Sequence, residues 1–387
     1  MAHLHWKFPA LLVSCTILLS ASGAAAQERP WRLVQEQRIG SLDDERTSLT
    51  RVPIVAVAPD LTLYVAQPME SLIRVFDSSG RYVRSIGRGG EGPGEFRLLG
   101  RMGLRGDTLW AVDLRLNRIS RFSAEGRHYS SDRLAPSPLG EEFQSTPPLG
   151  YLSDGSIVAQ PSIPTAMAAS GPNVQIPVAQ LDRQGRVLSR FPSASLRGDT
   201  REARIPNGVG FVRTPVPSSD LVRVAPDGSA VVFVRRPLPT RSDQAAFTVL
   251  KMRTPSDTVF LRSYRFPPRP VPPQAADSLR PGVLRFLERG MSRAEAERFI
   301  RDSDLIPQYQ PGISNVVVGD EGTIWLGREV LGERAVRWLN LNARGDIAGL
   351  VLVPANVRLL AARGDRLWGV ETGEWGVEYI VRYRVER

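Results

Sequence analysis

The sequence of 387 residues predicts an all-β fold, a single six-bladed β-propeller, from three observations. A tight turn followed by a β-strand recurs six times along the chain. The shorter spacings between recurrences fall between 43 and 48 residues, as in propeller blades. Gly (34 residues) and Pro (31 residues) are spread along the whole chain, as expected for many short strands joined by turns.

The repeated unit begins with Asp or, once, Glu, and continues with β-branched and aromatic residues suited to strands. Asp and the Gly that follows the acidic residue in three of the units tolerate the positive φ of tight turns. It occupies residues 60–64, 107–110, 154–158, 227–231, 321–325 and 365–368. The spacings are 46, 48, 73, 94 and 43 residues, measured between Leu63, Leu109, Ile157, Ala230, Ile324 and Leu367. The two long spacings predict insertions after the strands of the third and fourth blades.

A second hairpin follows the first in most blades. It occupies residues 74–81, 119–127, 179–186 and 339–346, and each copy contains a glycine. The fourth blade replaces it with residues 254–257, a turn without glycine. Together the two hairpins predict four antiparallel strands in each blade.

The two chain ends predict how the ring closes. Residues 379–385 form the third strand of the sixth blade, which leaves that blade without an outer strand. Residues 31–40 supply it, because residues 37–40 resemble residues 84–87 at the end of the first blade. This pairing removes open sheet edges.

A helical insertion is predicted at about residues 273–305, between blades four and five. Its apolar residues have helical spacing: Leu279, Val283, Leu284, Phe286 and Leu287. Gly290 ends this helix, and Ser292 with Glu295 forms a capping box that begins another. The insertion is either a lid over the channel or a brace.

Residues 1–26 have the features of a secretory signal peptide, which leaves residues 27–387 as the propeller. The apolar run is shorter than the roughly 20 residues needed to span a bilayer, so we expect no transmembrane segment in the mature chain. The predicted location is periplasmic or secreted. The alternative is a lipid anchor on Cys15, within a stretch that resembles a bacterial lipobox.

Removal of the signal peptide leaves no cysteine and a single histidine, His128. These counts exclude a disulfide framework, a Cys nucleophile and a Cys- or His-rich zinc site. A Ser-His-Asp relay would depend on His128, which lies in a predicted outer strand. We therefore assign no catalytic residue.

The chain has a formal charge of +10, nearly all of it from arginine, since only Lys7 and Lys251 are lysines. The arginines are scattered at strand ends and turns without a basic block, so we expect no nucleic-acid partner. At most the charge suggests weak attraction to anionic envelope polymers.

Two segments resemble a known family. Residues 110–119 are similar to the NHL repeat, in which a strand ends in Val-x-Asp and Asn-Arg-Ile opens the next. Residues 89–96 are similar to the Gly-x-Gly-Pro-Gly-Glu-Phe connection of bacterial NHL-like six-bladed propellers. The resemblance extends over residues 31–387 and is sharpest in blades one, two and five. It implies a fold, because this family hosts binding modules and enzymes alike.

Three motifs could indicate chemistry. Gly87, Gly89 and Gly92 match the spacing of a dinucleotide fingerprint, but a strand follows them instead of the required helix. Lactonases resembling regucalcin hold a divalent metal through channel carboxylates and an Asn, whereas Asp113 and Asn117 are better interpreted as loop caps. Amidating lyases of similar fold need zinc-binding histidines, which the mature chain lacks. We assign no metal ligand and expect no cofactor, although a divalent metal belongs to the alternative function given below.

Tryptophans recur at one strand position and also occur in a loop. Trp110, Trp325 and Trp368 share that strand position, which predicts packing between blades. Trp375 lies in a loop between strands and is a candidate for stacking on a ligand.

The sequence predicts an exported, monomeric propeller that binds an unidentified ligand or protein without catalysis, on the face that carries the long loops. The alternative is a metal-dependent hydrolase or lactonase that uses channel carboxylates, and a structural envelope component is a third option. Clustered carboxylates in the channel would favour the enzyme, whereas apolar and arginine residues would favour binding. The candidate contact residues are Arg88, Glu95, Asp113, Arg115, Arg328, Glu371 and Trp375.

Overall fold

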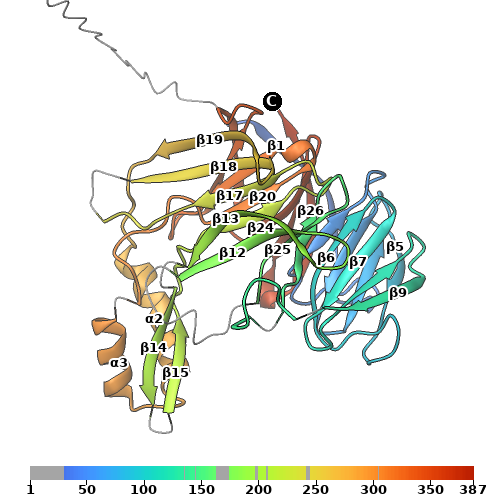
Figure 1. Cartoon of the computed structure of the whole chain (residues 1–387). Coiled ribbons are helices and arrows are strands. Elements are labelled where there is room, and N and C mark those ends of the chain that lie inside the picture. Colours follow the sequence, from blue (N-terminus) through green and yellow to red (C-terminus); the bar gives the residue numbers. More distant parts are fainter. Residues whose placement is uncertain are drawn as a thin grey trace, which may run out of the picture.

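The computed structural model describes residues 30–387 except 135, 144, 163–173, 197–198, 206–207, 241–244 and 304. Six four-stranded antiparallel sheets form the blades of a six-bladed β-propeller (Figure 1). The first strands of neighbouring blades contact one another all the way round, which closes the ring. The predicted fold class is therefore confirmed, while the signal peptide and Cys15 lie outside the described residues.

Strands are counted here from the inside of each blade outward. Blade 1 comprises β2 (Val55–Val57), β3 (Leu63–Gln67), β4 (Leu72–Phe76) and β5 (Tyr82–Ile86). Blade 2 comprises β6 (Leu99–Arg105), β7 (Thr108–Asp113), β8 (Arg118–Phe122) and β9 (His128–Arg133). Blade 3 comprises β10 (Pro148–Tyr151), β11 (Ile157–Ala159), β12 (Val174–Leu181) and β13 (Val187–Leu196).

The other three blades repeat this order. Blade 4 comprises β16 (Leu221–Val224), β17 (Val231–Arg235), β18 (Ala246–Thr254) and β19 (Asp257–Arg265). Blade 5 comprises β20 (Asn315–Val318), β21 (Ile324–Arg328), β22 (Ala335–Leu341) and β23 (Ile347–Pro354), with the 3-10 turn η1 (Asp320–Gly322) after β20. Blade 6 comprises β24 (Val357–Arg363), β25 (Arg366–Thr372), β26 (Glu378–Glu386) and β1 (Arg32–Ile39), with η2 (Glu374–Gly376) after β25.

The N-terminal strand completes blade 6, as predicted. β1 pairs antiparallel with β26 from Arg32 opposite Glu386 to Ile39 opposite Ile380. Ion pairs reinforce the pairing, because the carboxylate of Glu36 contacts the side chains of Arg366, Arg382 and Arg384. The two chain ends therefore share one sheet.

The hydrophobic core is divided into seams between neighbouring blades. One cluster combines residues of blades 4 and 5, another those of blades 5 and 6, and others occupy the remaining seams. Trp110, Trp325 and Trp368 are buried in these seams. Their predicted role in packing between blades is confirmed.

An annex made of two insertions stands out from the ring at the lower left of Figure 1. Helices α2 (Pro273–Leu287) and α3 (Arg293–Asp302) form the predicted insertion, and the capping box of Ser292 and Glu295 is present. They pack on a hairpin of β14 (Thr200–Ile205) and β15 (Gly208–Arg213). This hairpin belongs to the predicted insertion after the third blade, and it begins after β13 ends at Leu196.

Antiparallel order gives the ring two different faces. Turns from the first to the second strand and from the third to the fourth lie on one side, the tight-turn face. Loops from the second to the third strand, and the connections between blades, lie on the other side, the long-loop face. The annex belongs to the long-loop face, since its parts connect blades 3 to 4 and 4 to 5.

Candidate functional site

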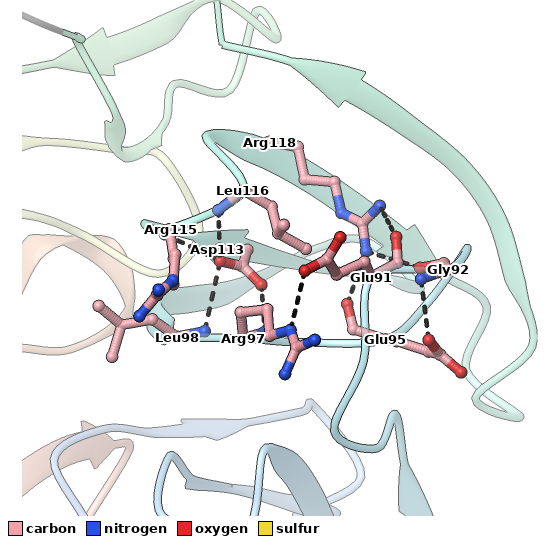
Figure 2. Close-up of polar contacts among 9 residues, drawn as sticks. All are labelled: Glu91, Gly92, Glu95, Arg97, Leu98, Asp113, Arg115, Leu116 and Arg118. Carbon is pink, nitrogen blue, oxygen red and sulfur yellow. Dashed lines mark hydrogen bonds and ion pairs between the residues drawn. The ribbon is translucent and has the colours of Figure 1, made fainter.

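The glycine-rich connection between blades 1 and 2 is held by two residues of blade 2 (Figure 2). The guanidinium of Arg118 donates hydrogen bonds to the carbonyls of Glu91, Gly92 and Glu95 at 2.9, 2.6 and 2.8 Å. The carboxylate of Asp113 accepts from the backbone N–H groups of Arg97, Leu98, Arg115 and Leu116. Asp113 is fully buried. The residues that resemble the NHL motif thus fix the loop geometry of this face.

Arg88 and Glu95 lie together in the same connection. Nε of Arg88 donates to Oε1 of Glu95 at 2.7 Å, and the N–H of Gly92 donates to its Oε2 at 2.8 Å. These two hydrogen bonds lower the pKa of Glu95. A Cβ atom at Gly90 would lie 2.0 Å from Oε2 of Glu95, so the ion pair requires glycine there. The Arg88 side chain is 81% exposed and remains accessible to a ligand.

The other candidate residues occupy separate places on the face. Arg115 is exposed beside Asp113. In blade 5, Nη2 of Arg328 donates to the carbonyl of Pro267 at 2.9 Å. In blade 6, Glu371 accepts from Nε of Arg38 at 2.8 Å, and Trp375 is 95% exposed. The seven residues therefore lie in three areas and share no single pocket in the described structure, so their contact with a ligand stays a prediction.

The sequence reasoning missed a group of arginines at the inner strands. Arg101 on β6 donates to the carbonyl of Pro148 at 3.3 Å, and Arg358 on β24 donates to that of Val52 at 2.7 Å. Arg236, directly after β17, donates to the carbonyls of Ser219 and Ile313 at 2.7 and 3.0 Å. Several of these bonds join one blade to the next, and they lie where the inner strands begin, at the long-loop end. They place positive charge at that mouth of the channel.

Arg101 and Arg223 converge although blade 3 separates their blades. The guanidinium of Arg101 donates to the carbonyl of Pro148, at the start of β10 in blade 3. The same strand lies close to blade 4, because a Cβ atom at Gly150 would lie 2.8 Å from the Val224 side chain. Burial lowers the pKa of Arg223. Burial, together with the charge of Arg223, lowers the pKa of Arg101 to about 10. The Arg223 side chain itself is exposed to solvent.

The two guanidinium groups lack a carboxylate partner. Among the residues that the structure describes, no Asp or Glu forms an ion pair with Arg101 or Arg223. Asp199 and Asp220 both lie near Arg236, and Asp199 also accepts from the backbone N–H groups of Ser218 and Ser219. Among the described residues, Arg101 and Arg223 carry the positive charge of this mouth that has no ion-pair partner.

Residues that could hold a metal do not cluster in the described part of the chain, where no three His, Asp or Glu side chains group suitably. Nε2 of His128 lies 2.8 Å from the hydroxyl of Ser131 on the outer strand β9.

Among the described residues, no helix is long and apolar enough to cross a membrane.

A register comparison between blades could have revealed Arg223. In blades 2, 5 and 6 a tryptophan of the second strand pairs with a small or β-branched residue of the first: Trp110 with Gly103, Trp325 with Val317 and Trp368 with Ala361. In blade 4 the equivalent pair is Val232 with Arg223. Among these four blades, only blade 4 has a long cationic side chain at this position of the first strand. Its partner on the second strand is a valine instead of a tryptophan.

Comparisons with known proteins support the fold. Residues 49–139 match the DUF5128 family, described as a 6-bladed beta-propeller. No curated protein matches the chain. A Bacteroides fragilis protein predicted to be exported has 14% identity and a TM-score of 0.54, with 92% of this chain and 96% of that chain covered. A DUF4221 family member from Bacteroides vulgatus has 13% identity and a TM-score of 0.53, with 93% and 99% covered.

A gluconolactonase from Xanthomonas campestris is also similar, at 12% identity and a TM-score of 0.45, with 92% and 99% covered. At such identities likeness concerns the fold and not the activity. The relationship to NHL repeats stays a prediction. The conclusion that the matches and the structure share is that this chain is a six-bladed β-propeller.

Proposed function

We propose that the protein is an exported, non-catalytic binding propeller that receives an anionic ligand at the channel mouth of its long-loop face. The observation that carries the proposal is the pair Arg101 and Arg223. Their guanidinium groups approach each other inside the ring without a carboxylate partner in the described structure. We expect the protein to act as a monomer.

Physical chemistry favours an anion at this place. Two like charges close together repel each other, which is unfavourable unless an opposite charge compensates. Guanidinium groups bind carboxylate, phosphate and sulfate through paired hydrogen bonds. Arg88, Arg115 and Trp375 are exposed on the same face and could extend the contact to a larger ligand.

Export is the second part of the proposal. The signal-peptide features of residues 1–26 support it. The similar Bacteroides fragilis protein predicted to be exported agrees with it. A mass measurement of the secreted protein tests this part: we expect the mature chain to begin at Gln27, and a lipid on Cys15 or a retained Met1 would contradict it.

The metal-dependent hydrolase remains the weaker candidate. It needs carboxylates grouped in the channel. In the described structure, the carboxylates of Asp113 and Asp199 are instead engaged by backbone N–H groups.

Calorimetric titration with citrate at fixed ionic strength tests the anion site. We expect wild type to bind citrate and Arg223→Gln to bind it roughly tenfold more weakly or worse, since a charge-assisted bond is lost. Arg344→Gln, an exposed arginine on the tight-turn face, is the matched control and should bind like wild type. Absence of citrate binding, or equal losses in both variants, would contradict the proposal.

A further inference from the structure

The seam between blades 2 and 3 holds a small buried cluster. It contains Trp110, Val112, Ile119 and Tyr151 among the described residues. A cavity of about 150 Å³ opens at the tight-turn end of this seam. Its lining residues are Arg105, Thr108, Trp110, Arg121, Tyr129 and Tyr151. Arg105 ends β6 on the side away from the long-loop face, so this cavity is separate from the channel mouth.

Aromatic rings form much of the cavity wall. Trp110 of blade 2 and Tyr151 of blade 3 meet edge to face, with centroids 5.6 Å apart and an angle of 66°. Tyr129 is half exposed, and its hydroxyl lies 2.9 Å from that of Thr108. Such a wall offers ring faces and edges to a planar apolar group.

Polar groups also line the cavity. Tyr151 is 8% exposed, and its hydroxyl forms no hydrogen bond of standard geometry within the described structure, although the Arg121 guanidinium is close enough to act on it. Burial raises the pKa of Tyr151, so the hydroxyl stays a neutral donor at neutral pH. The Arg105 side chain is solvent-exposed, its guanidinium lies 5.4 Å from the centroid of the Tyr151 ring, and its charge acts on Asp154 in the neighbouring turn. Arg121, in contrast, is paired with Asp132.

We propose that this cavity is a second binding site, specific for a small monocyclic aromatic carboxylate. Its volume equals that of a protein cavity known to hold one benzene molecule, about 150 Å³. The ring of the ligand would pack against Trp110 and Tyr151. Its carboxylate would accept hydrogen bonds from the guanidinium of Arg105 and the hydroxyl of Tyr151, which gives the buried hydroxyl an acceptor.

Titration of the full mature protein with benzoate, followed by ligand NMR at fixed ionic strength, tests the site. We expect Arg105→Gln to weaken benzoate binding roughly tenfold, since the charge-assisted bond is lost. Tyr151→Phe keeps the ring and removes one neutral hydrogen bond, so a weakening of roughly threefold to tenfold is expected. Benzyl alcohol should bind more weakly than benzoate.

A control variant makes the result specific. Arg127→Gln changes an exposed arginine of the same blade and face, so it should bind benzoate like wild type. The proposal fails if wild type does not bind benzoate, if Arg105→Gln binds it unchanged, or if Arg127→Gln weakens it equally. Loss of binding in Arg223→Gln alone would assign benzoate to the channel mouth and also overturn the proposal.

Discussion

The turn carboxylates of the tight-turn face and the arginines of the channel mouth form hydrogen bonds over very different distances along the chain. On the tight-turn face, Asp77 accepts from the backbone N–H groups of Ser79 and Arg81, and Asp182 accepts in the same way from Gln184 and Arg186. On the long-loop face, Arg101 reaches a carbonyl 47 residues away and Arg358 reaches one 306 residues away.

This difference separates what is local from what depends on the closed ring. A turn carboxylate finds its hydrogen-bond donors within four residues along the chain. Its hydrogen bonds therefore form whenever its own hairpin forms. An arginine at the channel mouth finds its acceptor only when neighbouring blades are in place. Charges that serve the turns are neutralised locally, whereas charges at the long-loop mouth remain available to a ligand.

The largest expected effect comes from opening the ring. Deletion of residues 27–40 removes β1, exposes the edge of β26 and leaves three arginines without Glu36. We expect a sharply lower melting temperature, measured by circular dichroism. A melting temperature equal to that of wild type would show that the closure contributes little.

A smaller but still large effect is expected at the buried loop cap. Asp113→Ala leaves four backbone N–H groups without their acceptor and should destabilise the protein by about 2–4 kcal/mol. Asp182→Ala removes a cap on an exposed turn and should cost less. Urea unfolding of both variants compares the faces directly, and equal losses would contradict the distinction.

The sequence predicted the local features well. Turn chemistry at residues such as Asp77, Asp182 and Ser292 depends on neighbours within four positions, and the repeat made the blade count evident. The hairpin of β14 and β15 was missed because its buried residues, Ala203 and Val212, pack on the distant helices and not on a blade. Arg101 and Arg223 were missed because two blades that are not neighbours bring them together.

The smallest expected effect is an acid dependence on the tight-turn face. Hydrogen bonds from the Ser79 hydroxyl and the Arg81 backbone lower the pKa of Asp77 from 3.8 to about 2. Its folded pKa lies below the unfolded value, so its stabilisation is present above pH 3.8 and is lost as the pH falls toward 2. Asp77→Asn should therefore be slightly less stable than wild type at pH 5, with a difference that narrows by pH 2. Thermal melts at both pH values measure it, and a constant difference would contradict this assignment.

If the anion site is correct, Arg223 lowers the stability of the free protein and increases its affinity for an anion. Because the charge of Arg223 disfavours the charged form of Arg101, Arg223→Gln should melt at a higher temperature than wild type when no anion is present. Citrate should raise the melting temperature of wild type through binding to the folded state, and should raise that of the variant much less.

Thermal melts of wild type and Arg223→Gln, each with and without citrate at constant ionic strength, therefore test the central claim most directly. The account predicts that the variant is the more stable protein without citrate and gains little from it. A variant that is less stable than wild type and still shows the full citrate shift would contradict an anion site at Arg223.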